Sequence, residues 1–567
     1  MGTSPVANQA NLGPGANYLP RVAPNEERFQ FADNLTWTKG KHTLKFGADI
    51  ANTSDYTYSI QNAFGAYTYQ TVTDFALDFS GNTAGSKHWQ SYQQTFGIPS
   101  VDATIRDYGF YVQDQFRVTN NLILNYGLRY EYAQLPQPTV VNPDYPQTGR
   151  IHSSKLNFAP RVGLAYSFDH GRMVLRAGYG MFHARFPGAL INNLYANNGV
   201  YQWLLNLQGN RPTDVASGPV YPMAFTAVPP NVKGSTTIQF LDPHARTPYS
   251  EQGSIGVERQ LPSGMNLNVS YIWSRGLQLL GVRDSNLGLP TGSATYAIND
   301  TGGNTLGNYT TPVYLQSNVI DPRYQHVYQD ENGLNSYYHA LAVQWRKAFT
   351  GGLQASASYT WAHAIDYNVG GGNNALFYST NTPVTFNGNY KFDKGSATLD
   401  QRHRFVLSFI EEPTFVHKDG AFFKYVVNNW QLAGITTLAA GRPVTATVLV
   451  QDTPVPGMAF NTTLNGFGGN TRVPFWPLNS LYTPPTYRAD ARISKIIPFS
   501  ERCKMFLMFE VFNISNTIVD TALNTQAYTE RGKVLTPTPG LGLGTQSAGF
   551  PDGTNARRAQ VGARLVF

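Results

Sequence analysis

The chain has 567 residues and a formal net charge of +7, yet only 14% of its residues are charged. That share is well below the roughly 25% of an ordinary soluble domain, and the many Gly, Tyr and Phe residues favour strands and turns. The basic residues are spread singly along the chain, which argues against a nucleic-acid partner.

The sequence also excludes a membrane protein built of helices, an internal disulfide and a thiolate zinc cluster. No apolar stretch reaches the roughly 18 residues that a membrane-spanning helix needs, and the mean hydropathy is −0.30. Strands that expose one apolar face to lipid are compatible with such a polar average. Cys503 is the single cysteine, which rules out an internal disulfide and a thiolate zinc cluster.

The N-terminal segment 1–26 lacks the basic start and apolar core of a secretory signal. We expect it to be an extracellular loop or a non-native start. From residue 27 to 567, apolar and polar residues alternate in segment after segment, which predicts strands with one apolar face. About fifteen segments show the pattern: 28–38, 42–55, 107–118, 122–132, 157–169, 172–184, 249–261, 265–273, 337–348, 353–366, 401–412, 428–441, 487–497, 504–516 and 557–567.

Short and long connections alternate between these predicted strands. Turn-like sequences such as 119–121 and 350–352 join pairs into hairpins. Long polar segments separate the pairs, and we expect them to form loops without regular structure: 56–106, 134–156, 185–248, 278–336, 367–400, 442–486 and 517–556. This alternation is typical of an all-β, antiparallel transmembrane β-barrel with short periplasmic turns and long extracellular loops.

The long connection after residue 185 is unusually apolar for an exposed segment. Tyr195, Tyr201 and Trp203 are therefore candidate substrate contacts; the alternative is a loop that folds inward over the barrel mouth. Trp37, Trp273 and Trp361 fit the aromatic girdles at the two membrane interfaces, with ordinary sheet packing as the alternative.

The predicted strands near the C-terminus supply two more sets of candidates. Glu510, Asn513 and Asn516 are polar residues within a predicted strand, so we expect them to face the barrel lumen, where a plug would contact them. The final strand places Ala563, Leu565 and Phe567 on one face. A terminal Phe on an amphipathic strand resembles the signal for barrel assembly; the alternative is a Phe that stands there by chance.

Five segments in order resemble TonB-dependent receptors of the Oar-like type: Tyr108-Gly-Phe-Tyr-Val-Gln-Asp-Gln-Phe116, Leu122-Ile-Leu-Asn-Tyr-Gly-Leu-Arg-Tyr130, Asn157-Phe-Ala-Pro-Arg-Val-Gly163, Phe509-Glu-Val-Phe-Asn513 and Val561-Gly-Ala-Arg-Leu-Val-Phe567. The resemblance implies a barrel of about 22 strands around a plug, and coupling to the TonB energy apparatus through that plug. It also implies outer-membrane lipid and the barrel-assembly machinery as partners, in a Gram-negative outer membrane.

Nothing before Glu27 supplies a signal, coupling box, plug or the first strands, so the resemblance covers the C-terminal barrel portion. Phosphate-binding, nucleophile-elbow, zinc-protease and dinucleotide motifs are absent from the sequence, so we expect neither an enzyme nor a cofactor. His183, His363 and His403 each lack a second ligand at metal spacing, which predicts no metal site. Asp330-Glu331-Asn332-Gly333 resembles the start of a calcium loop but lacks its closing Glu, so we expect a plain turn.

The sequence thus predicts an outer-membrane receptor that takes up an unidentified nutrient. The alternatives are a structural or adhesive barrel, a receptor fragment that transports nothing, and a soluble all-β enzyme.

Overall fold

The computed structural model describes the chain apart from several segments. These are residues 1, 4–9, 12–21, 59, 61, 81–84, 210–211, 230–235, 368–385, 419, 453, 460–462, 468–471, 501 and 548–554. Most of the predicted segment 1–26 therefore lies outside the described residues. Its last part belongs to a strand that begins at Val22, earlier than predicted.

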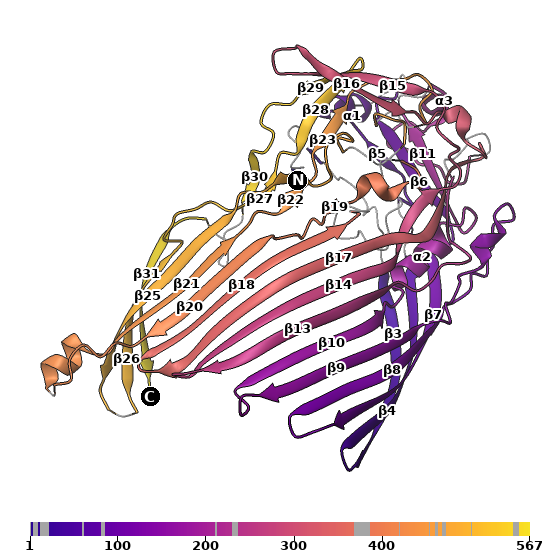
Figure 1. The fold of residues 1–567 in the computed structure, drawn as a ribbon. Helices are drawn as coiled ribbons and strands as arrows, with labels where there is room; N and C mark the ends of the chain where they lie inside the picture. Colours follow the sequence, from indigo (N-terminus) through magenta and orange to yellow (C-terminus); the bar gives the residue numbers. More distant parts are fainter. Residues whose placement is uncertain are drawn as a thin grey trace.

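Fifteen long strands form one curved antiparallel wall (Figure 1). All fifteen predicted segments are confirmed as strands of this wall. In spatial order they are β3 (Val22–Lys39), β4 (His42–Tyr58), β7 (Ser100–Arg117), β8 (Leu122–Gln134), β9 (Phe158–Phe168), β10 (Met173–His183), β13 (Tyr249–Leu261), β14 (Met265–Asp284), β17 (Tyr324–Thr350), β18 (Leu353–Asp366), β20 (His403–Glu411), β21 (Trp430–Ala439), β25 (Thr486–Pro498), β26 (Lys504–Phe512) and β31 (Arg558–Val566).

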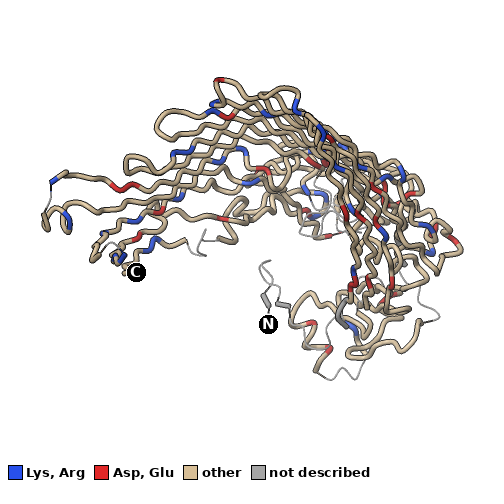
Figure 2. The backbone as a smooth tube through the Cα atoms, turned by 90° about the horizontal axis from the view of Figure 1, so that it is seen from below, with Lys and Arg blue, Asp and Glu red and all other residues tan. Residues whose placement is uncertain are grey.

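The register gives the wall one apolar and one polar face. Residues paired across an antiparallel ladder lie on the same face, and Leu124 pairs with Leu164 and with Phe116. The neighbouring residue Asn125 pairs with Gly163 and Gln115 on the opposite face. Lys, Arg, Asp and Glu are scattered along the wall rather than gathered in one place (Figure 2).

The pairing runs without interruption from β3 to β31. Among the described residues, no ladder joins these two strands to each other. Both are exposed along almost their whole length, and Phe29 and Val561 expose 73% and 83% of their surface. The wall therefore has two edges with unpaired backbone groups, a feature that hydrocarbon does not tolerate.

The long connections are folded, contrary to the prediction that they lack regular structure. They form small sheets beyond the wall (Figure 1). One sheet contains β5 (Ala66–Thr68), β6 (Ser91–Gly97) and β11 (Gln202–Gln208). Another contains β15 (Ser293–Asn299), β16 (Thr305–Pro312), β23 (Thr447–Val450), β28 (Gln526–Arg531) and β29 (Val534–Pro537).

Shorter strands complete the connections: β1 (Gly2–Thr3) with β2 (Ala10–Asn11), β22 (Pro443–Val444) with β24 (Leu481–Tyr482), β27 (Asp520–Leu523) with β30 (Gly544–Ser547), β12 (Thr236–Leu241) along β17, and β19 (Gly395–Ser396) along β18. We call all of this folded material beyond the long-loop ends of the wall strands the cap. Its interior consists of separate apolar clusters, one around Tyr296 and Leu535 and another around Leu190 and Ile191. Buried apolar area inside the connections explains why they fold despite their polar composition.

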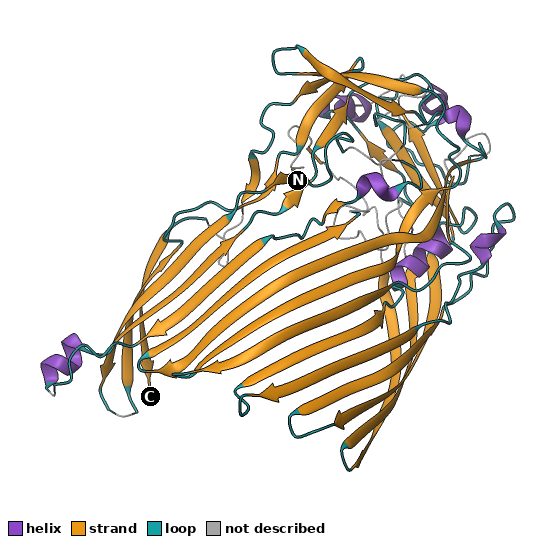
Figure 3. Ribbon diagram, in the orientation of Figure 1, coloured by secondary structure: helices purple, strands orange, loops and turns teal. Residues whose placement is uncertain are grey.

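The helices are short and lie in the connections (Figure 3). They are α1 (Val72–Phe79), α2 (Gly188–Ala196), α3 (Pro212–Ser217), the 3-10 turns η1 (Pro146–Gly149), η2 (Gln316–Asn318) and η3 (Tyr390–Asp393), and the π-helical turn η4 (Phe423–Val427). Thr71 caps α1 through its side chain, and Asp74 bonds back to the Thr71 N–H, so a capping box fixes the start of that helix. In the described part of the chain, no helix is long and apolar enough to span a membrane.

Candidate functional site

A cavity of about 900 Å³ lies on the polar face, between β14 and β26. Gly264 and Ala348 line it, so it lies toward the short-turn end of the wall. Its polar lining comes from six strands: Asn266, Arg346, Gln354, Ser356, Ser408, Asp490, Arg492 and Glu510. Phe409, Ile410, Ile435 and Phe512 add apolar surface, so the cavity is suited to an occupant with both polar and apolar groups.

Arg492 makes several polar contacts within this lining. Its Nη2 donates to Gln431 Oε1 at 3.3 Å, and its Nη1 lies 3.7 Å from Glu510 Oε1. Gln560 also donates to Glu510. The buried Nε of Arg492 finds no hydrogen-bond partner among the described residues. An unsatisfied buried N–H is costly, so this hydrogen-bond network is incomplete among the described residues.

The three residues expected to face the lumen have different surroundings. Glu510 lies on the polar face, paired in register with Arg492 and Gln560. Asn513 follows the end of β26 with φ +52 and is 1% exposed. Its side-chain amide donates to the carbonyls of Thr517 and Asn555, so it holds a turn together. Asn516 lies in the same turn, because the strand ends at Phe512 rather than at residue 516 as predicted.

Ala563, Leu565 and Phe567 are arranged as the amphipathic pattern predicts. Ala563 and Leu565 pair in register with Leu507 and Met505 on the apolar face. Phe567 follows the last strand residue and is 93% exposed. The terminal ring is therefore accessible to another protein.

The three aromatic residues proposed as substrate contacts lie inside the cap. Tyr195 and Tyr201 are buried, and the Tyr201 hydroxyl donates to the carbonyl of Ser100. Trp203 packs against Phe96, with 5.7 Å between the ring centroids. In this arrangement the two tyrosines pack inside the cap and offer little surface to a ligand.

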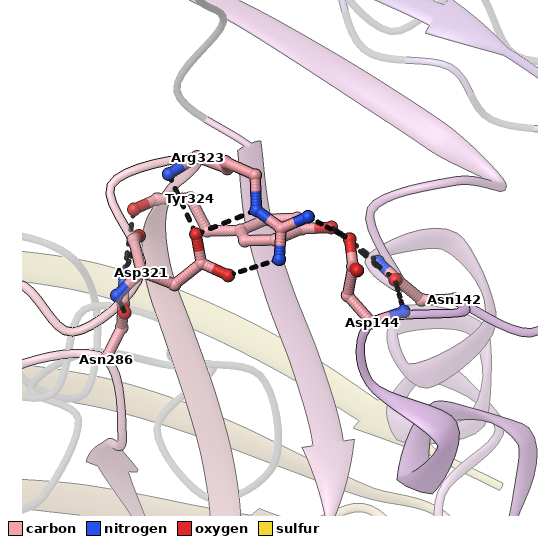
Figure 4. Close-up of polar contacts among 6 residues, drawn as sticks. All are labelled: Asn142, Asp144, Asn286, Asp321, Arg323 and Tyr324. Atoms are coloured by element: carbon pink, nitrogen blue, oxygen red, sulfur yellow. Dashed lines mark hydrogen bonds and ion pairs between the residues drawn. The ribbon is translucent and has the colours of Figure 1, made fainter.

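A polar network joins two connections that are distant in sequence (Figure 4). Arg323 donates from Nε and Nη2 to the Asp321 carboxylate at 3.0 and 2.7 Å, and its Nη1 lies 2.9 Å from Asp144 Oδ2. The Tyr324 hydroxyl donates to the same Asp144 oxygen at 2.9 Å. Asn286 Nδ2 donates to the carbonyls of Asp321 and Tyr324. A bidentate guanidinium pair of this kind fixes geometry as well as adding energy.

Buried carboxyl groups anchor the cap at two further points. Asp284 accepts from the Val327 N–H at 3.0 Å and lies 2.7 Å from His326 Nδ1. Glu530 is fully buried in the five-stranded sheet, and burial, with Asp452 beside it, raises the pKa of its carboxyl to about 7. The contacts of Asp284 and the burial of Glu530 both depend on the cap remaining folded.

Neither the Arg323 network nor the buried carboxyl groups could be identified from the sequence, because their partners are separated by long connections. Local spacing carries no signal for such pairs.

The structure corrects the prediction that the segment from Asp330 to Gly333 forms a plain turn. This segment lies within β17 and forms neither a turn nor a calcium loop. Across the described residues, no group of three His, Cys, Asp or Glu side chains is arranged to hold a metal ion.

The fold and its surfaces define the class of protein. A curved antiparallel wall with one apolar and one polar face, short turns at one end and long connections at the other, is the architecture of an outer-membrane β-barrel. Residues 2–549 match the family model described as "Outer membrane beta barrel domain". The chain therefore belongs to this family, and its place is the outer membrane of Gram-negative bacteria.

The chain is similar to several solved structures of outer-membrane transporters and receptors. The transporter YddB from Escherichia coli is 11% identical, with a TM-score of 0.49, over 88% of this chain and 52% of that one. The FrpB iron transporter from Neisseria meningitidis is 12% identical, with a TM-score of 0.45, over 95% of this chain and 55% of that one. The ferripyoverdine receptor of Pseudomonas aeruginosa is 11% identical, with a TM-score of 0.44, over 91% of this chain and 47% of that one.

The chain thus spans about half the length of the solved structures that it matches. No curated protein matches it.

Proposed function

We propose that residues 27–567 form the C-terminal barrel part of a TonB-dependent receptor that imports a nutrient across the outer membrane. The observation that carries the proposal is the cavity that Arg492 and Glu510 help to line. A barrel that served only as a membrane anchor would have no need of such a cavity on its lumen-facing side. A plug segment, displaced during uptake, would contact the charged groups of this lining.

The two unpaired edges support the same proposal. Lipid cannot satisfy the free N–H and C=O groups of β3 and β31. Further strands must pair with both edges in the membrane, and a longer receptor chain would supply them. The proposed chemistry is binding and gating alone, so we assign no catalytic residue and no cofactor.

The first test is to read the genomic sequence upstream of Met1 for an in-frame signal peptide and plug. The second is uptake: cells that carry the complete gene with Arg492→Gln should import less nutrient than wild-type cells, with equal amounts of barrel in the outer membrane. Arg172→Gln is the control, because Arg172 is exposed at a short turn away from the cavity. An in-frame stop codon upstream, or an absence of import by the wild-type protein, would instead favour a structural or adhesive barrel. Import that is unchanged by dissipating the proton gradient would contradict TonB coupling.

A further inference from the structure

The apolar face carries a band of aromatic and imidazole side chains on its central strands. Trp273, His339 and His363 lie side by side in register on β14, β17 and β18. One step closer to the short turns, Trp361 pairs with His403 of β20. Side chains with an apolar body and a polar tip are characteristic of the membrane interface. The band therefore marks the outer boundary of the hydrocarbon layer.

Immediately beyond this band lies a cluster of two cations on one aromatic ring. The Arg275 guanidinium carbon is 5.7 Å from the centroid of the Tyr337 ring, and Lys394 Nζ is 5.0 Å from it. Arg275 and Lys394 are both exposed. Contact with the ring holds the cations in place but leaves their N–H groups free to donate.

No carboxylate neutralises this pair of cations. Neither Arg275 nor Lys394 forms an ion pair or a side-chain hydrogen bond with any residue that the structure describes. Glu251 lies opposite Arg275 in register but makes no ion pair with it. The buried Asp400 is already engaged by His363 Nδ1 at 3.2 Å and by the Ala364 N–H. The cluster thus has an excess of positive charge.

The spacing along the strands sets the depth of the cluster. On the apolar face of β14 the residues between Met265 and Arg275 are uncharged, and Met265 pairs with Lys347 of β17. From Met265 to Arg275 is roughly 33 Å along a strand. At the usual barrel tilt this is a depth of roughly 25 Å, which matches the apolar band of such barrels. Lys347 and Arg275 therefore mark the two boundaries.

We propose that Arg275, Lys394 and Tyr337 form a binding site for the phosphate group of a lipid in the outer leaflet. An unpaired guanidinium and ammonium at headgroup depth meet lipid phosphates, which are the anions fixed at that level. The guanidinium can donate two parallel N–H groups to one phosphate. The apolar face below the cluster would hold the acyl chains of the same lipid. This inference does not depend on whether the protein transports anything.

The test measures lipid binding to the purified full chain, folded in detergent. The probes are bis-phosphorylated lipid A, its fully dephosphorylated form and inorganic phosphate, and the readout is bound lipid per protein by native mass spectrometry. A charge near a membrane surface contributes about 1 kcal/mol, so each of Arg275→Gln and Lys394→Gln should weaken binding of the phosphorylated lipid about fivefold. The dephosphorylated lipid should bind wild type and variants equally.

Lys347→Gln is the control, because it removes one half-buried cation at the opposite boundary, where Thr350 accepts from its ammonium group, and should leave binding of the phosphorylated lipid unchanged. Tyr337→Leu should weaken binding without a change of charge, since the ring orients both cations. Correct folding of each variant is checked by its heat-modifiable electrophoretic mobility. The proposal would be overturned if wild type and the Arg275→Gln/Lys394→Gln double variant bound the phosphorylated lipid equally well. It would also be overturned if inorganic phosphate, at the same concentration as the phosphorylated lipid, displaced that lipid from the protein.

Discussion

Arg323 Nη1 lies 2.9 Å from Asp144 Oδ2 and thereby links the connection after β8 to the start of β17. The two residues belong to segments that the chain reaches only after crossing the wall several times. Its Nε and Nη2 donate to the Asp321 carboxylate. The contact therefore fixes the position of two cap connections relative to each other.

Replacing Arg323 by Ala should release these connections without unfolding the wall. Amide hydrogen exchange should become faster in 142–148 and 286–321, because the carboxylates of Asp144 and Asp321 lose their shared donor. Arg531→Ala is the control, as Arg531 is an exposed arginine of the cap. Unchanged exchange in both segments would mean that the ion pairs contribute nothing to the cap. A double-mutant cycle with Asp144→Asn would measure the coupling between the two side chains directly.

The stability of the five-stranded sheet should fall as the pH rises from about 5 to about 8. The Glu530 carboxyl has a folded-state pKa of about 7, raised by burial from its ordinary value of 4.5. The folded state therefore keeps a proton that the unfolded state has already lost, and raising the pH favours unfolding. The difference amounts to at most about 3 kcal/mol.

Glu530→Gln should remove most of this pH dependence. The measurement is the urea midpoint of the cap at pH 5 and pH 8, followed through Trp476, which packs against the cluster of Tyr296 and Leu535. Asp452 and Tyr296 are the other titratable groups that act on Glu530 or respond to it, so Asp452→Asn should give an intermediate result. A midpoint of Glu530→Gln that shifts with pH as much as wild type would refute the assignment.

Leu535→Ala should destabilise the cap by about 2 to 5 kcal/mol, because Leu535 is fully buried and its loss leaves a cavity. The wall should be unaffected, since the cluster around Leu535 contains only cap residues. Limited proteolysis should therefore cut the cap of the variant while its heat-modifiable mobility persists. Leu543→Ala serves as control, as this leucine is 66% exposed. Loss of the folded wall in Leu535→Ala would show that cap and wall fold as one unit.

Phe567→Ala should lower the amount of assembled barrel in the outer membrane several-fold. The terminal ring is 93% exposed and contributes no packing to the wall, so its removal should act on recognition and not on stability. Outer-membrane fractionation measures the first quantity, and the thermal unfolding of the purified variant measures the second. Phe499→Ala removes another exposed ring and should leave assembly unchanged. Normal assembly of Phe567→Ala would favour a terminal Phe present by chance.

The strands of the wall could be predicted because each carries its own signal. The alternation of apolar and polar residues in 122–132 or 265–273 is a local pattern that repeats every two residues. A strand with one side facing lipid must have this alternation. Strand ends were predicted less well: β14 continues to Asp284 and β17 begins at Tyr324, because these extensions pair beyond the membrane, where alternation is not required. β26 instead ends earlier than predicted, at Phe512, and Asn513 and Asn516 lie in the turn that follows it.

The sequence by itself determined the class of this protein. The antiparallel strands, the apolar and polar faces of the wall and the alternation of short and long connections all follow from local periodicity and turn spacing. Only the tertiary structure decided that the long connections fold into a cap, that Tyr195 and Tyr201 are buried in it, and that Arg323 reaches Asp144. It also brought Arg275 and Lys394 together on Tyr337. These contacts join residues far apart in the chain, and their formation depends on chain closure and buried area rather than on local pattern.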